Sequence, residues 1–119
     1  MRKHILVVDD QPGIRFLLDE VFTNEGYQVT TANTGKEALD HIHTSTFDLI
    51  MLDYKLPIMD GIQVLHQMES EKIILPAILM SGLAEEAMQE AESCTLVKQV
   101  MAKPFNIMEV CDIVNEIVK

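Results

Sequence analysis

Acidic side chains stand where two short apolar segments of this sequence end. Asp53 closes the run Leu49–Leu52, and Asp9 with Asp10 closes the run Ile5–Val8. Short apolar runs bounded by polar or turn residues are typical of strands that are buried on both faces of a parallel sheet. In open α/β sheets, ligands bind outside the carboxyl ends of such strands. Three carboxylates at two neighbouring strand ends would form a site for a divalent cation.

Two later apolar runs end in a hydroxyl and in an ammonium group. The run Ala77–Met80 is followed by Ser81, and the run Val100–Ala102 is followed by Lys103 and Pro104. Phosphoryl transfer needs mainly positioning and neutralisation of charge, which a hydroxyl, an amine and a carboxylate-bound cation supply together. The four strand ends therefore suggest a phosphoryl site that depends on Mg²⁺, with Mn²⁺ as the alternative cation.

Each of these residues also has a structural explanation when it is taken alone. The acidic pair could cap a helix, Asp53 could occupy a turn, Ser81 could cap a loop, and proline could simply close the last strand. Their occurrence at four strand ends of one small chain favours a common site. Without a cation, three close carboxylates would repel one another, so at least one pKa should rise and the group should titrate as a coupled set.

The composition is that of one globular domain, residues 1–119. Of the 119 residues, 48% are hydrophobic and 24% are charged, which is enough for a core without disulfides or metals as staples. The formal net charge of −10 argues against a surface for nucleic acid or for an anionic membrane, because both require basic patches. It favours divalent cations and positively charged partners, although an acidic surface can also serve solubility alone.

Cysteine content and hydropathy indicate the cellular compartment in which the protein is expected. Cys94 and Cys111 are too few and too irregularly spaced for a disulfide framework or a zinc site, so reduced thiols are expected. Met1–His4 precedes only a short apolar run, unlike a signal peptide, and no apolar run approaches the ~20 residues of a membrane span. We therefore expect a soluble, cytoplasmic protein.

The sequence alternates between strand-like and helix-like segments along its whole length. Strands are predicted at residues 5–8, 28–32, 48–52, 77–81 and 97–102, each followed by a helix with apolar residues at helical spacing. This alternation requires right-handed crossovers and a parallel sheet covered on both faces. We expect an α/β fold: a flavodoxin-like, doubly wound (βα)5 sheet in the order 2-1-3-4-5, which would bring Asp9, Asp10 and Asp53 together.

These motifs resemble the receiver domain of two-component response regulators over essentially the full length of the chain. The segments that carry the resemblance are Val8-Asp9-Asp10, Asn33–Leu39, Asp53 with Pro57, Met59-Asp60-Gly61, Ser81-Gly82 and Lys103-Pro104-Phe105. Several separated motifs in one fixed order make this a specific signature. The resemblance implies a protein that accepts a phosphoryl group from a phosphohistidine on a partner.

The resemblance also implies a role for each site residue. Asp53 would be the phosphoacceptor. Lys103 would pair with a phosphoryl oxygen, and its bond to the following proline would be cis. Ser81 would hydrogen-bond the phosphoryl group and draw its loop inward, which would bias a surface with two states. The implied magnesium ligands are Asp10, Asp53, the backbone carbonyl of Lys55 and, through water, Asp9.

Within this family, the sequence is most similar to the single-domain phosphotransferases of sporulation phosphorelays in spore-forming bacteria. The similar segments are Asp9–Arg15, Leu17-Leu18, Glu20–Phe22, Glu25–Tyr27 and Asp53–Pro57. The similarity implies a sensor histidine kinase, a histidine phosphotransferase and an aspartyl-phosphate phosphatase as partners of a monomeric protein. The implied docking face consists of Gln11, Gly13, Ile14, Leu17, Leu18, Pro104 and Phe105. Periodicity requires at least one of the three apolar helix residues in this set to face inward.

Some positions depart from the usual receiver pattern. Val100 stands where receivers that control transcription often carry an aromatic switch residue, which favours a phosphoryl shuttle, as does a sequence that stops after the fifth predicted helix. Leu96-Val97 stands where Gly-Ala is frequent, and Ile58 stands where a small or polar residue is usual. We therefore expect unusual packing around the fourth helix.

A receiver that acts only as a scaffold is disfavoured, because the acids and the lysine are all present. Two other functions compete with the shuttle. One is a receiver that regulates transcription by dimerising when it is phosphorylated. The other is a magnesium-dependent phosphatase with an aspartate nucleophile. Such a phosphatase generally needs a general acid two residues after the nucleophile. Lys55 holds that position, so a carrier that turns over only by slow autodephosphorylation is favoured over an enzyme.

Overall fold

Five strands alternate with five helices in the computed structural model, which describes residues 2–119. The strands are β1 (His4–Val8), β2 (Gln28–Ala32), β3 (Leu49–Asp53), β4 (Ala77–Ser81) and β5 (Val97–Ala102). The helices are α1 (Pro12–Asn24), α2 (Gly35–Thr44), α3 (Gly61–Ser70), α4 (Ala84–Ala91) and α5 (Ile107–Val118). Within the described residues, no helix is both long enough and apolar enough to cross a membrane.

The strands form one parallel sheet in the order β2-β1-β3-β4-β5, so the predicted topology is confirmed. The order reverses between β1 and β3, which are hydrogen-bonded neighbours. Their register pairs Val8 with Leu52. The residues that follow this pair, Asp9 and Asp53, therefore emerge side by side at the carboxyl edge of the sheet.

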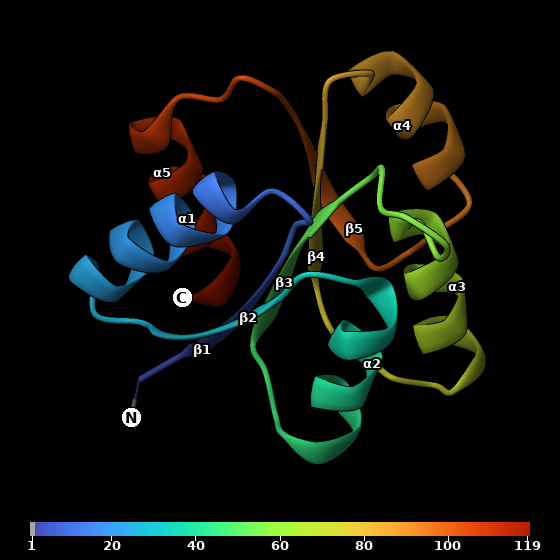
Figure 1. Cartoon of the computed structure of the whole chain (residues 1–119), viewed down its shortest axis with the longest axis horizontal. Helices are drawn as coiled ribbons and strands as arrows, with labels where there is room; N and C mark the ends of the chain where they lie inside the picture. Colours follow the sequence, from blue (N-terminus) through green and yellow to red (C-terminus); the bar gives the residue numbers. More distant parts are fainter. Residues whose placement is uncertain (1) are drawn as a thin grey trace.

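Helices cover both faces of the sheet and enclose two cores. Figure 1 shows α1 and α5 on one face and α2, α3 and α4 on the other. Alternate strand residues enter each core: Val7 packs with Phe22 of α1, whereas Val8 packs on the side of α2 and α3. Every residue of β3 and β4 is buried, which explains their unbroken apolar runs.

Local signals set the helix ends. The side chains of Thr34, Asp60 and Asn106 each accept a hydrogen bond from a backbone N–H in the first turn of the following helix. Helix α1 begins with Pro12 at its first position, and Gly26 follows its end with φ of +95°. The residue before Pro12 makes no side-chain cap, so the acidic pair after β1 does not serve as the N-cap of α1.

Helix α4 is the least firmly attached of the five. It has eight residues, and only Ala87 and Ala91 are buried. Leu83, which precedes it, makes no side-chain capping bond and is half-exposed. Beneath the helix, Leu96 is buried in the core and Val97 packs against it. Bulky residues therefore stand at the start of β5, next to a helix that contributes only small residues to the core.

Candidate functional site

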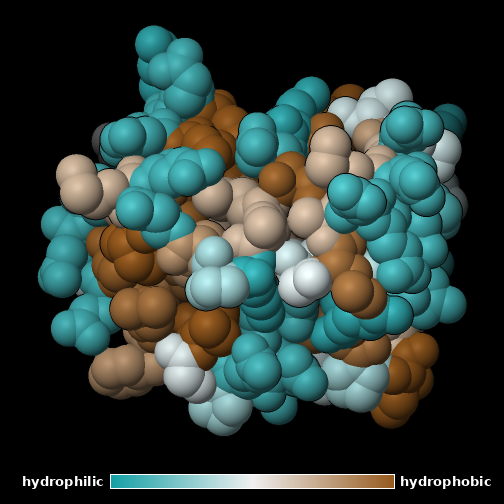
Figure 2. Space-filling model, turned by 90° about the horizontal axis from the view of Figure 1, so that it is seen from above, coloured by the Kyte–Doolittle hydropathy of each residue, from teal (hydrophilic) through white to brown (hydrophobic). Residues whose placement is uncertain are grey.

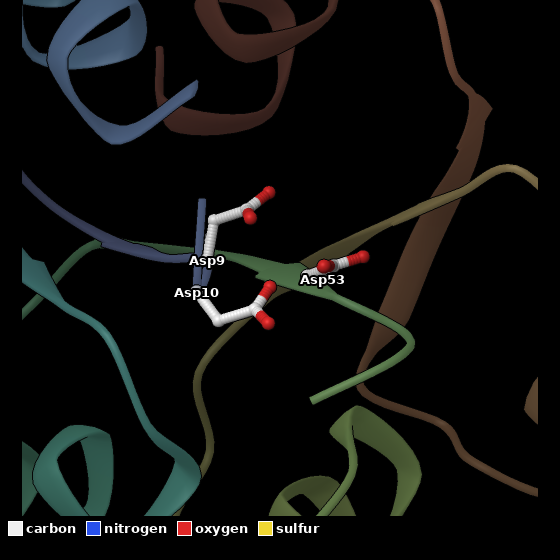
Figure 3. A group of neighbouring side chains, drawn as sticks. All are labelled: Asp9, Asp10 and Asp53. Carbon is white, nitrogen blue, oxygen red and sulfur yellow. The ribbon is translucent and has the colours of Figure 1, made fainter. Parts of the chain in front are cut away.

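Three carboxylates meet at the carboxyl edge of the sheet, where the topology changes direction. Asp9 and Asp10 follow β1, and Asp53 is the last residue of β3. Figure 3 shows the Asp9 and Asp10 side chains extended toward the side on which Asp53 lies. Each residue offers an oxygen within 4.8 Å of the oxygens of the other two. Asp9 and Asp53 are buried and Asp10 is exposed, so the cluster opens to solvent on one side.

Lys103 supplies the positive charge nearest to these acids. Its Nζ lies 2.8 Å from Asp9 Oδ2 and 3.4 Å from Asp53 Oδ1. The residue follows β5 and forms a cis peptide bond with Pro104. Its backbone N–H donates to the Ser81 carbonyl oxygen at 2.8 Å, which holds the ends of β4 and β5 together. One ammonium group against three carboxylates leaves the site with an excess of negative charge.

The excess of negative charge affects the pKa of Asp53. Burial, followed by repulsion from Asp9, raises the pKa of Asp53 to about 6. The charge and hydrogen bond of Lys103 and a hydrogen bond from the Lys55 backbone oppose the rise. The predicted increase in at least one carboxylate pKa is thus confirmed at Asp53.

The donor set fits a hard divalent cation. Mg²⁺ binds oxygen ligands and typically takes one or two carboxylates with water and phosphate oxygens. A cation here would offset both the burial and the repulsion that disfavour the ionised Asp53 carboxylate. Asp10 and Asp53 are therefore suitable ligands, and Asp9 lies close enough to act through water. The Lys55 carbonyl ligand stays a prediction, since only the N–H of this residue is seen to interact with Asp53.

Ser81 ends β4 on the other side of Asp53. In the register of β3 and β4, Asp53 pairs with Met80, so Ser81 lies one residue further toward the edge. Ser81 is 1% exposed, and its Oγ accepts a hydrogen bond from the Leu83 N–H at 2.8 Å. The hydroxyl thus connects the site to the residue that precedes α4, and its own hydrogen can be donated to a ligand.

Two further residues shape the site, although the sequence motifs did not single them out for this role. The Arg15 guanidinium donates to the Asp9 backbone oxygen at 2.8 Å, which links α1 to the end of β1. A Cβ at Gly61, the first residue of α3, would lie 2.6 Å from the Asp53 backbone oxygen. Only glycine permits this close approach. Both contacts span fewer than ten residues, but each joins the end of a strand to the helix that follows it, so they depend on how that helix packs on the sheet.

Only some residues of the predicted docking face are exposed to solvent. Gln11, Gly13 and Pro104 are exposed, and Leu17 is 39% exposed. Ile14 and Phe105 are partly buried against the core that α1 and α5 share with the sheet. Leu18 is 0% exposed. Its inclusion in the docking face was therefore wrong, because its helical position turns it into the core beside Phe22.

Known proteins resemble this sequence over nearly its whole length. Sporulation initiation phosphotransferase F of Bacillus subtilis strain 168 is 42% identical over 117 residues, which cover 98% of this chain and 94% of that protein. Alkaline phosphatase synthesis transcriptional regulatory protein PhoP of the same organism is 39% identical over 110 residues. That match covers 92% of this chain but only 46% of the longer relative.

A solved structure and a family model agree with these relatives. The response regulator TrrA of Thermotoga maritima, solved in complex with Mg²⁺-BeF, superposes with a TM-score of 0.85 at 32% identity, covering 97% of this chain and 98% of that one. The family model of the response regulator receiver domain matches residues 5–115. This chain therefore belongs to the receiver domain family of two-component response regulators.

Proposed function

We propose that this receiver takes a phosphoryl group from a sensor histidine kinase onto Asp53 and passes it to a histidine phosphotransferase in a phosphorelay. The phosphorelay would be of the kind that controls sporulation. The observation that carries the proposal is the set of three carboxylates with Lys103 3.4 Å from the Asp53 oxygen. The identity of 42% to a sporulation phosphotransferase supports the choice of pathway.

Asp53 is suited to be the nucleophile. With a pKa of about 6, its carboxylate is mostly ionised at pH 7 and is more basic than an ordinary aspartate. In the proposed step, an Asp53 oxygen attacks the phosphorus of a partner's phosphohistidine. The new P–O bond forms as the P–N bond breaks, and the departing imidazole nitrogen keeps the electron pair of the P–N bond. The reverse reaction on a second histidine would pass the phosphoryl group onward.

The neighbouring residues position the transferred group. Lys103 would exchange part of its contact with Asp9 and Asp53 for a phosphoryl oxygen, and Ser81 would donate its hydroxyl hydrogen to another. Asp10 and Asp53, with Asp9 through water and the Lys55 carbonyl, would hold Mg²⁺ or Mn²⁺. When bound, the cation would neutralise charge on the phosphoryl oxygens and the carboxylates.

The surroundings of the site favour a carrier. Gln11, Gly13 and Leu17 offer accessible positions on α1 and at its start, directly after the acidic pair, for a kinase or a phosphotransferase, and an aspartyl-phosphate phosphatase could use the same face. Val100, partly buried against the core, offers no aromatic ring for a switch that drives dimerisation. We therefore propose a monomer. The identity of 39% to the transcriptional regulator PhoP keeps a dimerising receiver as the second candidate.

A phosphotransfer assay tests the proposal. Wild type and Asp53→Asn are each incubated with Mg²⁺ and a ³²P-labelled histidine kinase, and a histidine phosphotransferase is then added. Wild type should acquire label and lose it to the phosphotransferase, whereas Asp53→Asn should stay unlabelled. Asp112→Asn, which removes an exposed carboxylate from α5, is the matched control and should behave as wild type. Labelled Asp53→Asn would exclude the site, and label that stays on a dimeric wild type would favour the transcriptional alternative.

A further inference from the structure

Tyr54 joins the phosphoacceptor strand to α4. It directly follows Asp53, and its side chain is 3% exposed in the core shared by α2, α3 and α4. Its hydroxyl donates to Glu86 Oε1 of α4 at 3.3 Å, and the Glu90 carboxylate, one turn further along α4, lies near the same hydroxyl. The Tyr54 side chain thus connects the end of β3, next to Asp53, with α4.

This contact matters because α4 has little else to hold it. Its buried residues, Ala87 and Ala91, each bury little apolar area, and no side chain caps its first turn. The outer surface of the helix is acidic and polar, and Figure 2 shows hydrophilic residues gathered on the side of the molecule where α3 and α4 lie. The Tyr54 ring and hydroxyl therefore add to an attachment that otherwise rests on small buried side chains.

A second link runs from the same site to the start of α4. Ser81 accepts a hydrogen bond from the Leu83 N–H at 2.8 Å, and Leu83 precedes the first residue of the helix. A ligand that draws Ser81 toward Asp53 would therefore pull on the first turn of α4. The Tyr54 hydroxyl bond to Glu86 would resist that movement, because it holds the body of the helix to β3.

We propose that Tyr54 is a positioning residue that couples occupancy of Asp53 to the placement of α4 through the hydrogen bond of its hydroxyl to Glu86, with Glu90 as the neighbouring alternative acceptor. The inference rests on the proposed function, since it assumes that a phosphoryl group occupies Asp53. Because the bond stabilises the placement of α4 described here, its loss lowers the cost of moving the helix. A ligand at Asp53 that moves α4 should then bind more tightly, and α4 and Asp53 should influence each other reciprocally.

Beryllofluoride, which imitates a phosphoryl group on aspartate, provides the test. Its affinity in the presence of Mg²⁺ is measured by ¹⁹F NMR for wild type, Tyr54→Phe, the pair Glu86→Ala with Glu90→Ala, and the combination of all three. Tyr54→Phe and the glutamate pair should each tighten binding about 2- to 10-fold, the range expected from one hydrogen bond. The combined variant should bind no more tightly than either, because all remove the same link.

Matched controls separate this link from charge and from general stability. Glu85→Ala with Glu92→Ala removes two charges from the α4 region without touching Tyr54, and it should leave the affinity unchanged. Thermal unfolding of each variant detects a merely structural role, which would lower stability without altering the affinity. Equal affinity in wild type and Tyr54→Phe, or additive effects in the combined variant, would overturn the coupling. Failure of wild type itself to bind beryllofluoride would instead overturn the proposed function.

Discussion

Asp53 carries a charge in a place that disfavours it. The residue is 6% exposed and lies beside Asp9, so the folded protein holds its proton more tightly than the unfolded chain does. Lys103 offsets only part of the burial and repulsion that disfavour the ionised carboxylate, because its ammonium group interacts with both Asp9 and Asp53. Such a site is less stable than it could be, and the same burial and repulsion would favour a bound cation and a more basic carboxylate, as the proposed role of Asp53 requires.

Removing the charge of Asp53 should therefore stabilise the protein without metal. Because its pKa rises from 3.8 to about 6 on folding, the unfolded state loses its proton first as the pH increases. Stability then falls between about pH 4 and pH 6 and stays low above it. We expect Asp53→Asn to be more stable than wild type by about 1–3 kcal/mol at pH 7.5. The difference should shrink toward zero at pH 4.

Urea unfolding in EDTA at a series of pH values measures this difference. Asp112→Asn removes one exposed carboxylate from α5 and reports the effect of net charge alone. If Asp53→Asn gains no more stability at pH 7.5 than this control, or gains equally at pH 4, the strained carboxylate is not the cause.

At the scale of elements, the turn between β3 and α3 contains a second strained position. Ile58 has φ of +69°, and its side chain is fully exposed. A β-branched residue in this left-handed region is an outlier, because its Cβ crowds the backbone at a cost of roughly 1–2 kcal/mol. This is the region where the sequence departs from the small or polar residue usual in receivers, so the departure carries a conformational cost.

Ile58→Gly should stabilise the fold by about 1 kcal/mol, because glycine adopts positive φ freely and no packing is lost. Thermal and urea unfolding measure the effect. Ile74 is the matched control: it is 91% exposed but does not have positive φ. Ile74→Gly should destabilise the protein by about 0.5–1 kcal/mol through the entropy of the unfolded chain. A loss of stability in Ile58→Gly would show that the turn is not strained.

Elements could be predicted from periodicity to a large extent. The second and fifth strands have the limits expected from their β-branched and apolar residues, although both lie at the edges of the sheet and also contain polar residues. Periodicity could not decide which apolar residues of α1 face outward. Leu17 and Leu18 are neighbours about 100° apart on the helix, and only the packed structure shows that Leu18 is core.

Contacts between distant segments are the part that local patterns could not provide. The Tyr54 hydroxyl meets Glu86 across 32 residues of sequence, and Lys103 meets Asp9 across 94. Lys103 was predictable as a site residue because its position after a strand leads to the same edge as the acids. Tyr54 could not be predicted as a residue that contacts α4. In the sequence it follows an apolar strand and precedes a turn, and only the packed structure shows that its hydroxyl contacts α4.

For the whole molecule, charge and topology act on the same site. The sheet brings carboxylates from β1 and β3 together in a protein whose formal net charge is −10. The rest of the acidic surface adds a long-range field that attracts cations to this edge. A cation that binds the folded state but not the unfolded chain would therefore relieve the local repulsion and raise global stability together.

Mg²⁺ should raise the melting temperature more than NaCl of equal ionic strength does. At ten times the dissociation constant, the gain is about 1.4 kcal/mol, which corresponds to roughly 3–7 °C for a domain of this size. Mn²⁺ should act likewise, because it accepts the same oxygen ligands. Asp10→Asn should lose most of the gain and Asp112→Asn should keep it. If Asp10→Asn gains as much as wild type, the cation does not bind at the carboxylate cluster. If Asp10→Asn does lose the gain in melting temperature, the carboxylates whose repulsion destabilises the metal-free protein are the same groups that bind the cation.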